Sequence, residues 1–266
     1  MAGQLSVINK KTIIELAESG NRLDGRKHNE FRSIRIETGL IPNAQGSALV
    51  ELGKTKVLAG IKLSVGVPYP DKLDEGVLAT GAEMAPIASP DFERGPPSPT
   101  SIELARVVDR VIRESETIDT KKLCIKAGEK VWMLNLDFYI LDMDGNLIDA
   151  GVLAGMAALL TARMPKYDIE KEKIDFDTLE GPVPVSGRPI GITHAKVGSK
   201  LLVDPTENEE DVMAGRVTIG INDEGDVCAI QKGGVAGFSS EEIVKIIEES
   251  KRLSEELRKK LPAPAN

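Results

Sequence analysis

One stretch of this chain predicts a helix that is apolar on every side. Residues 149–164 read DAGVLAGMAALLTARM, a run of small and aliphatic side chains. A helix that is apolar all round is buried on all of its faces. Its small residues allow close packing against a sheet, so we interpret its glycines as packing positions and not as a phosphate-binding loop. The fold must therefore surround this helix with other elements.

Short runs with strand-like patterns occur on both sides of this helix. The predicted strands cover residues 32–38, 47–52, 56–65, 77–84, 122–126, 131–142, 190–197, 200–203, 216–222 and 226–232. A short helix is predicted at residues 10–19 and a closing helix at 240–261, and Ser239 with Glu242 forms a capping box at the start of the second. Turns are predicted at residues 53–54, at 142–146 (DMDGN) and at 222–225 (NDEG). Strands followed by a helix occur twice along the chain. This order indicates an α+β fold with mixed sheets packed against helices.

The bulk composition excludes several classes of nucleic-acid-binding and nucleotide-binding proteins. Of the 266 residues, 41% are hydrophobic and 29% are charged, which is ordinary for a globular protein. The net charge of −8 argues against bulk attraction to nucleic acid, and an aromatic content of 3% argues against a base-stacking platform. No GxGxxG follows a strand, and no GxxxxGK[ST] occurs. Any nucleic-acid contact would have to be local or shared with a partner.

The chain offers little for metal binding, disulfide formation or membrane insertion. Cys124 and Cys228 do not form a CxxC pair, and His28 and His194 have no companion ligands nearby. We therefore predict no metal and no cofactor. No apolar run approaches a membrane span, and the starting segment MAGQLSVINKK lacks a signal-peptide core. These features predict a reduced, cytoplasmic protein.

Residues 91–113, DFERGPPSPTSIELARVVDRVIR, combine a Pro/Gly loop with an amphipathic helix. Arg106, Arg110 and Arg113 follow the i, i+4, i+7 spacing and share one stripe of that helix. Three acidic residues lie within one turn of them: Glu103, Asp109 and Glu114. Such spacings form surface ion pairs worth about 0.2–0.5 kcal/mol. Arginine in place of lysine favours phosphate recognition. Both interpretations, a self-paired face and a phosphate contact, remain open from this segment alone.

The order of several short motifs resembles the RNase PH family. In chain order, they are RLDGR at 22–26, GSA at 46–48, ERG at 93–95, SIELAR at 101–106, DAG at 149–151 and Asp204 before an acidic run. The combination of GPPSP, IELARVVDRVIR and VDPTENEE is similar to the non-catalytic ring subunits of the archaeal exosome. The resemblance extends from about Arg22 to the last helix.

This resemblance implies an RNase PH fold of the ribosomal protein S5 domain 2-like class, with two βαβ-type halves. The implied organisation is an N-terminal helix and RxDGR turn in 1–30, a first domain in 31–166, a linker in 167–189 and a second domain in 190–266. The linker begins with the charged run from Tyr167 to Lys173. The implied partners are a catalytic RNase PH-like sister subunit in a hexameric trimer of heterodimers, RNA-binding cap subunits and RNA, with no membrane.

Two departures from the family pattern predict that this chain is not itself catalytic. In active members a G-[ST]-R turn at the head of the buried helix holds the attacking phosphate, and here we match it to Gly151, Val152 and Leu153. Active members also carry an acid before the penultimate strand, where residues 213–217 here read MAGRV. Asp204 remains, but a single acid does not make a metal-assisted site. We read Asp204 as a strand-end cap and predict no catalytic residue.

The resemblance implies that Arg106 and Arg110 hold RNA phosphates beside the active site of the sister subunit. Arg113 and Arg94 are further candidates for RNA binding. Arg22, Asp24 and Arg26 are expected to have a framework role, with salt-bridged arginines at the subunit interface. One alternative is that the chain is itself a phosphorolytic 3′-exoribonuclease, or a nucleotidyl transferase in reverse. The other is a scaffold without RNA contact, which would have its arginines buried or paired with its own acids.

Overall fold

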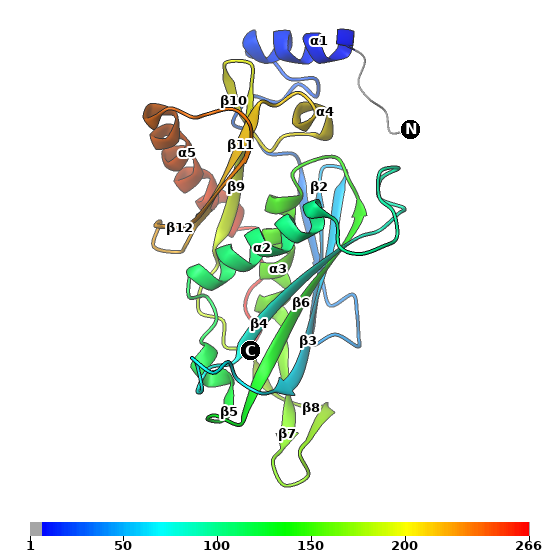
Figure 1. Ribbon diagram of the computed structural model, residues 1–266, viewed down its shortest axis with the longest axis vertical. Helices are drawn as coiled ribbons and strands as arrows, with labels where there is room; N and C mark the ends of the chain where they lie inside the picture. Colours follow the sequence, from blue (N-terminus) through cyan, green and yellow to red (C-terminus); the bar gives the residue numbers. More distant parts are fainter. Residues whose placement is uncertain (1–6, 266) are drawn as a thin grey trace.

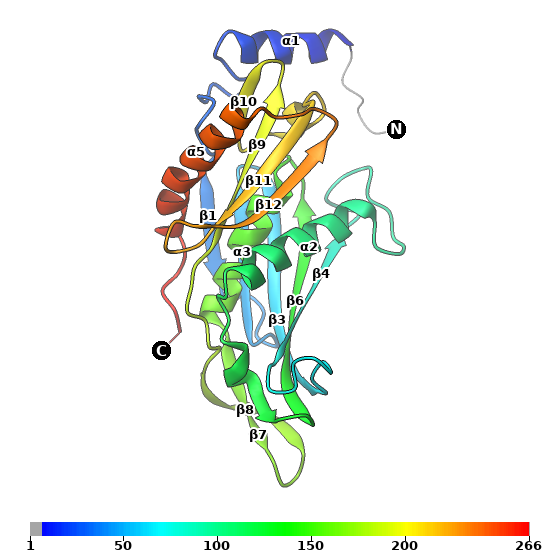
Figure 2. The ribbon, with the colours of Figure 1, turned by 60° about the vertical axis from the view of Figure 1, so that its left-hand side comes forward.

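The computed structural model describes residues 7–265, which form alternating layers of sheet and helix (Figure 1). The first layer is a six-stranded sheet: β1 (Ile34–Thr38), β2 (Gly46–Leu52), β3 (Thr55–Gly66), β4 (Val77–Met84), β5 (Cys124–Lys126) and β6 (Lys130–Asp142). The helices α2 (Pro99–Glu114) and α3 (Leu147–Thr161) cover one face of this sheet. A second sheet packs on the other side of these helices, and α5 (Ser240–Arg258) covers its outer face (Figure 2).

The first sheet has the strand order β1-β2-β3-β6-β4, with β5 beside β6. Its neighbours are antiparallel except for β4 and β6, which run parallel. The chain makes the parallel connection through α2, a 3₁₀ turn (Thr120–Leu123) and β5. The predicted tight turn between β2 and β3 is confirmed, and Gly53 adopts a φ of +59° there. A left-handed backbone of this kind carries little steric cost for glycine.

The second sheet contains β9 (Ile190–Val197), β10 (Lys200–Val203), β11 (Gly215–Ile221) and β12 (Val227–Gly234). Its order is β10-β9-β11-β12, and all its pairs are antiparallel. The predicted hairpin turn between β11 and β12 is confirmed by the bond from the Asn222 amide to the Asp226 carbonyl. The short helix α4 (Glu207–Glu210) lies between β10 and β11. The capping box predicted at the start of α5 is also present.

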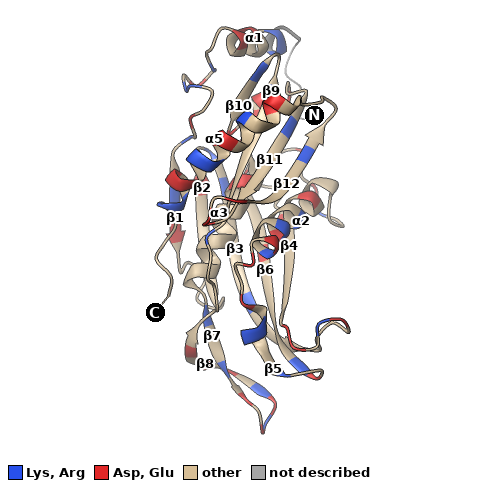
Figure 3. Cartoon of the chain, turned by 90° about the vertical axis from the view of Figure 1, so that its left-hand side faces the viewer, with Lys and Arg blue, Asp and Glu red and all other residues tan. Residues whose placement is uncertain are grey.

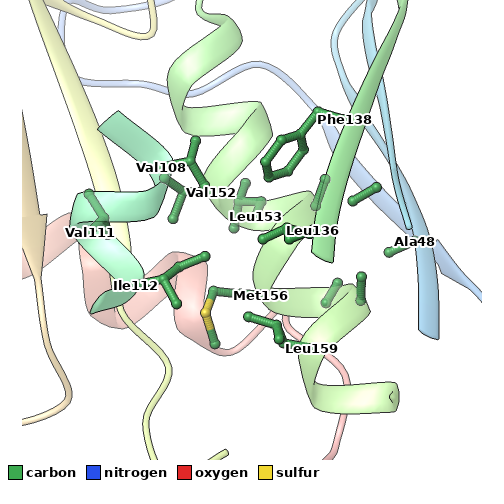
Figure 4. Close-up of a cluster of buried hydrophobic side chains, with 14 of the residues drawn as sticks. Ala48, Val108, Val111, Ile112, Leu136, Phe138, Val152, Leu153, Met156 and Leu159 are labelled. Carbon is green, nitrogen blue, oxygen red and sulfur yellow. The ribbon is translucent and has the colours of Figure 1, made fainter. Parts of the chain in front are cut away.

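The predicted burial of the apolar helix is confirmed. Every described residue of α3 from Leu147 to Leu160 is buried, between the two sheets and against α2. A Cβ added to Gly151 would lie 3.0 Å from Leu104 of α2, and one added to Gly155 would lie 3.1 Å from Phe138 of β6. These glycines are therefore packing positions. Figure 4 shows side chains of α2, α3 and β6 meeting in this core.

Some element boundaries differ from the sequence prediction. The first helix, α1 (Val7–Glu18), begins before the predicted residue 10. Part of the predicted linker is regular, because β7 (Arg163–Asp168) and β8 (Lys173–Pro182) form a two-stranded antiparallel ribbon. Tyr167 anchors this ribbon edge-to-face on Trp132, at 6.0 Å between ring centroids. The division of the chain into domains at the predicted boundaries stays a prediction.

Within residues 7–265, no helix combines the length and the apolar character needed to cross a membrane.

Candidate functional site

The first turn of α3 opens onto a small cavity of about 50 Å³. The helix begins at Leu147, after Asn146 in the left-handed conformation with φ 53° and ψ 47°. Leu147 and Ile148 line the cavity from the helix, and both are 7% exposed. The polar residues in its wall come from α2, the turn before α3, β9, α4 and β11: Thr100, Glu103, Asn146, Thr193, Glu210 and Arg216.

The sequence analysis assigned the head of this helix to the wrong residues. Gly151, Val152 and Leu153 lie in the second turn of α3, where they are fully buried. Val152 and Leu153 point into the hydrophobic core (Figure 4). The helix head consists instead of Asn146, Leu147 and Ile148, so a phosphate reaching it would meet neither a hydroxyl nor a guanidinium from this turn. The aliphatic character expected at the helix head is present, five residues earlier than predicted.

Arg216, the second residue of β11, supplies the guanidinium that lines this cavity. Its Nη2 lies 2.7 Å from Oε2 of Glu103 on α2. Its Nε is buried and has no hydrogen-bond partner among residues 7–265. The match of this position to an acid of active family members stays a prediction from the sequence resemblance. Because Glu103 neutralises this arginine, the cavity does not offer a free positive charge to an anion.

Two carboxyl groups at the head of α3, those of Asp149 and Glu210, also oppose the binding of an anion in the cavity. The Asp149 carboxyl is completely buried and accepts hydrogen bonds from Asn146 Nδ2 at 2.9 Å, the Thr193 amide at 2.9 Å and Thr193 Oγ1 at 2.7 Å. Burial raises the pKa of Asp149 to about 7. Burial likewise raises the pKa of Glu210, which accepts from the Asn146 amide at 2.9 Å, to about 7. A phosphate would meet these groups as repelling charges whenever they ionise.

Asp204 is the centre of a buried ion-pair network, and not only a strand-end cap. It has a positive φ of 51° and no exposed surface. Its carboxylate accepts from Arg26 Nη1 at 2.9 Å, from Arg32 Nε at 2.9 Å and Nη2 at 2.7 Å, and from Asn146 Nδ2 at 2.8 Å. The network joins the segment after α1 to the head of α3. Asp204 therefore has all its polar contacts inside the chain.

The RxDGR residues take part in the same framework. Arg22 is buried, and it donates to Glu209 Oε1 at 2.8 Å and to the Val203 carbonyl at 2.8 Å. Arg26 Nε lies 2.7 Å from Asp24 Oδ2. These contacts attach residues 22–26 to the end of β10 and to α4 within this chain. A position at a subunit interface stays a prediction.

The structure separates the candidate RNA-binding arginines by their contacts. Arg106 is exposed and forms no hydrogen bond or ion pair with any residue between 7 and 265. Arg110 is half-buried and donates to Gln231 Oε1 of β12 at 3.1 Å. Arg113 is paired with its own helix, at 2.9 Å from Asp109 and 3.4 Å from Glu114. Basic and acidic residues both appear along α2 in Figure 3.

Arg94 lies in the loop between β4 and α2, apart from the helical stripe. Its side chain is exposed, and it has no ion pair with the described part of the chain. The loop leads into α2 through Ser98, whose side chain accepts from the Ser101 amide at 3.2 Å and caps the helix. Arg94 therefore remains available to solvent, and its predicted RNA contact stays a prediction.

Sequence reasoning missed three residues that organise the helix head. Arg32, Asn146 and Thr193 were assigned no role, although each donates to Asp149 or Asp204. The DMDGN turn signalled that a special backbone conformation precedes α3, but it did not indicate which carboxylates Asn146 would meet. No three or more His, Cys, Asp or Glu residues within 7–265 are arranged to hold a metal ion.

Comparisons with known proteins agree with this architecture. The model of the 3′ exoribonuclease family, domain 1, matches residues 30–165, and that of domain 2 matches residues 187–252. The chain belongs to the RNase PH family. The predicted RNase PH fold is thereby confirmed.

Within the RNase PH family, the chain resembles archaeal exosome subunits. It is 47% identical over 255 residues to the exosome complex component Rrp42 of Thermococcus gammatolerans, covering 95% of this chain and 93% of that protein. It is 46% identical over 241 residues to the component of the same name from Methanothermobacter thermautotrophicus, covering 90% and 89%. A chain in the structure of the Archaeoglobus fulgidus exosome with RNA bound to the active site superimposes with a TM-score of 0.89 at 42% identity, covering 96% and 98%. These likenesses confirm the predicted resemblance to archaeal exosome ring subunits.

Proposed function

We propose that this chain is a non-catalytic ring subunit of an archaeal exosome. In this role it contributes to 3′-to-5′ RNA degradation by binding RNA and by structuring the active site of a catalytic RNase PH-like sister subunit. Its partners would be that sister in a hexameric trimer of heterodimers, RNA-binding cap subunits and RNA, in the cytoplasm. The similarity to Rrp42 components and to the RNA-bound Archaeoglobus fulgidus exosome supports this proposal.

The observation that carries the proposal is the chemistry at the head of α3. Phosphorolysis needs a site that holds inorganic phosphate with preorganised donors or positive charge. Leu147 and Ile148 offer neither, and Glu103 neutralises Arg216 at 2.7 Å. The buried carboxyl of Asp149 adds negative charge beneath the cavity when it ionises. This chain would therefore act through a neighbour and not by its own catalysis.

The RNA contact in this proposal belongs to α2. Arg106 and Arg110 are four residues apart, so their side chains lie on one face of the helix. The Arg106 guanidinium is exposed and is not neutralised by an ion pair within residues 7–265. Arg110 is steadied by Gln231, a neutral side chain that leaves its charge intact. Two neighbouring guanidiniums can form charge-assisted hydrogen bonds with phosphate oxygens, and planar guanidinium groups suit phosphate geometry.

The test uses the ring reconstituted with its catalytic sister, in phosphate-free buffer so that RNA is bound but not degraded. We expect the double variant Arg106→Ala, Arg110→Ala to assemble normally and to weaken single-stranded RNA binding about tenfold at low salt. Each phosphate contact contributes roughly 0.7 to the slope of log affinity against log salt for single strands. The slope should therefore fall by about 1.4, as measured by fluorescence anisotropy.

The control for this experiment is Arg252→Ala. It removes one positive charge from an exposed residue of α5, whose Nη1 pairs with Glu256 at 2.8 Å. RNA affinity should stay within a factor of two. Unchanged affinity in the Arg106/Arg110 double variant would contradict the RNA-binding role and would support the pure scaffold. Release of nucleoside diphosphates by this chain alone, given phosphate and magnesium, would support the alternative of intrinsic exoribonuclease activity.

A further inference from the structure

Glu103 is placed to weaken the RNA-binding arginines of α2. It precedes Arg106 by three residues, and side chains with this spacing are neighbours on a helix surface. It also precedes Arg110 by seven residues, two turns along the same face. In a helix considered by itself, Glu103 would pair with Arg106 and reduce the charge available to a phosphate. The structure shows a different arrangement.

Arg216 of β11 holds the Glu103 carboxylate instead. The distance from Arg216 Nη2 to Glu103 Oε2 is 2.7 Å, and the other oxygen, Oε1, accepts from Gln231 Nε2 at 3.5 Å. Both donors approach from the second sheet. The side chain of Arg216 is 19% exposed and that of Glu103 is 33% exposed. An ion pair shielded in this way is less weakened by solvent and salt than a fully exposed pair along the helix.

The same contacts extend to the second arginine. Gln231 donates to Glu103 with its amide nitrogen and accepts from Arg110 Nη1 with its amide oxygen at 3.1 Å. A continuous chain of polar contacts therefore runs from Arg216 through Glu103 and Gln231 to Arg110. Arg106 lies beside this chain and has no ion pair within residues 7–265.

We infer that Arg216 is a positioning residue for RNA binding, which keeps Glu103 away from Arg106 and so leaves the Arg106 charge free for an RNA phosphate. Arg216 lies at the edge of the cavity beside α3, at a place where the family resemblance implies an acid in active members. An acid there could not restrain Glu103, because the two carboxylates would repel each other. This inference rests on the proposed RNA-binding role of α2.

The test compares four forms of the reconstituted ring in phosphate-free buffer: wild type, Arg216→Met, Glu103→Gln, and both changes together. Methionine preserves much of the aliphatic stem of arginine and removes its charge. With Glu103 released, we expect Arg216→Met to weaken RNA binding about threefold and to lower the salt slope by roughly 0.7, the value of one phosphate contact. Glu103→Gln should bind at least as tightly as wild type.

The double variant decides the mechanism. If Arg216 acts by restraining Glu103, then Glu103→Gln in the Arg216→Met background restores wild-type affinity and salt slope. A double variant as weak as Arg216→Met would overturn the inference, because it would mean that Arg216 attracts RNA with its own charge. Wild-type binding by Arg216→Met would also overturn it. Neither result affects the proposed RNA-binding role of α2, which fails if the Arg106/Arg110 alanine variant binds as wild type does.

Folding and assembly are checked by thermal unfolding and by the mass of the ring. If Arg216→Met does not assemble, Arg216→Lys takes its place, since lysine keeps the charge and loses the planar guanidinium. A smaller loss of affinity that Glu103→Gln again reverses would support the inference, and an irreversible loss would overturn it. Arg252→Ala serves as the matched loss of one charge outside the network.

Discussion

The helices α2 and α3 pack against each other, yet the charged groups on the exposed face of α2 and at the head of α3 have opposite surroundings. At the head of α3, Asp149, Asp204 and Glu210 have partners inside the chain. On α2, Arg106 has no ion pair among the described residues and faces solvent. Two helices in direct contact thus differ in their charges: those at the head of α3 are paired within the chain, and Arg106 on α2 is exposed, where we propose that it binds an anion.

Removing the centre of the internal network should have the largest effect. We expect Asp204→Asn to lower the free energy of unfolding by about 3 kcal/mol or more, because the change leaves the charges of Arg26 and Arg32 without their buried partner. Asparagine tolerates the positive φ of this position, so the change tests charge more than backbone strain. Urea denaturation measures the effect. The control is Asp168→Ala, which removes an exposed pair with Lys171 and should cost less than about 0.5 kcal/mol.

The second prediction concerns pH and the buried carboxyl of Asp149. Burial raises its pKa to about 7 from 3.8, so between about pH 4 and pH 7 the folded chain keeps a proton that the unfolded chain has lost. This group therefore stabilises the fold at low pH, and its contribution is lost as the pH rises through 7. Asp149→Asn should remove this dependence. Relative to wild type, its stability should improve on the order of 2 kcal/mol from pH 5 to pH 8.

Urea denaturation at several pH values, on wild type and Asp149→Asn in parallel, measures this difference. Glu210, whose pKa is also raised to about 7 by burial, is present in both forms. Parallel stability curves for the two proteins would show that Asp149 is ionised in the folded chain at pH 5. The buried head of α3 would then hold an ionised carboxylate at a pH where we expect a neutral carboxyl.

The smallest effect is expected on α2 itself. Arg113 is 59% exposed and already paired with Asp109 and Glu114. Arg113→Ala should change the RNA affinity of the ring less than twofold, and it should change the free energy of unfolding by less than about 0.5 kcal/mol. Fluorescence anisotropy measures the RNA affinity of Arg113→Ala in parallel with that of the single variant Arg106→Ala. A loss of RNA affinity equal to that of Arg106→Ala would show that pairing with Asp109 and Glu114 does not reduce the contribution of Arg113 to RNA binding.

Periodicity and turn chemistry predicted most of the fold. The run at 149–164 correctly indicated a helix buried on all sides, and Gly53, the 222–225 turn and the α5 capping box were found where the sequence placed them. The same apolar run could not show where its helix begins, because apolar residues on every face give no change of pattern at the first turn. Asn146, in a left-handed conformation, precedes α3, and the helix begins at Leu147, four residues before the assigned phosphate turn at Gly151. The ribbon of β7 and β8 was missed because its charged residues resemble a linker.

By itself, the sequence determined which side chains are available: an arginine stripe on one helix, and no hydroxyl or guanidinium in the aliphatic turn that begins another. Only the tertiary structure decided which charges meet. Helix spacing offers Glu103 to Arg106, whereas the fold brings Arg216 to it from 113 residues further along the chain. The physical reason is that an ion pair is strong where the two charged groups lie close together and are shielded from solvent. Both conditions depend on how the second sheet packs against α2 through β9 and β12, and not on spacing along either element.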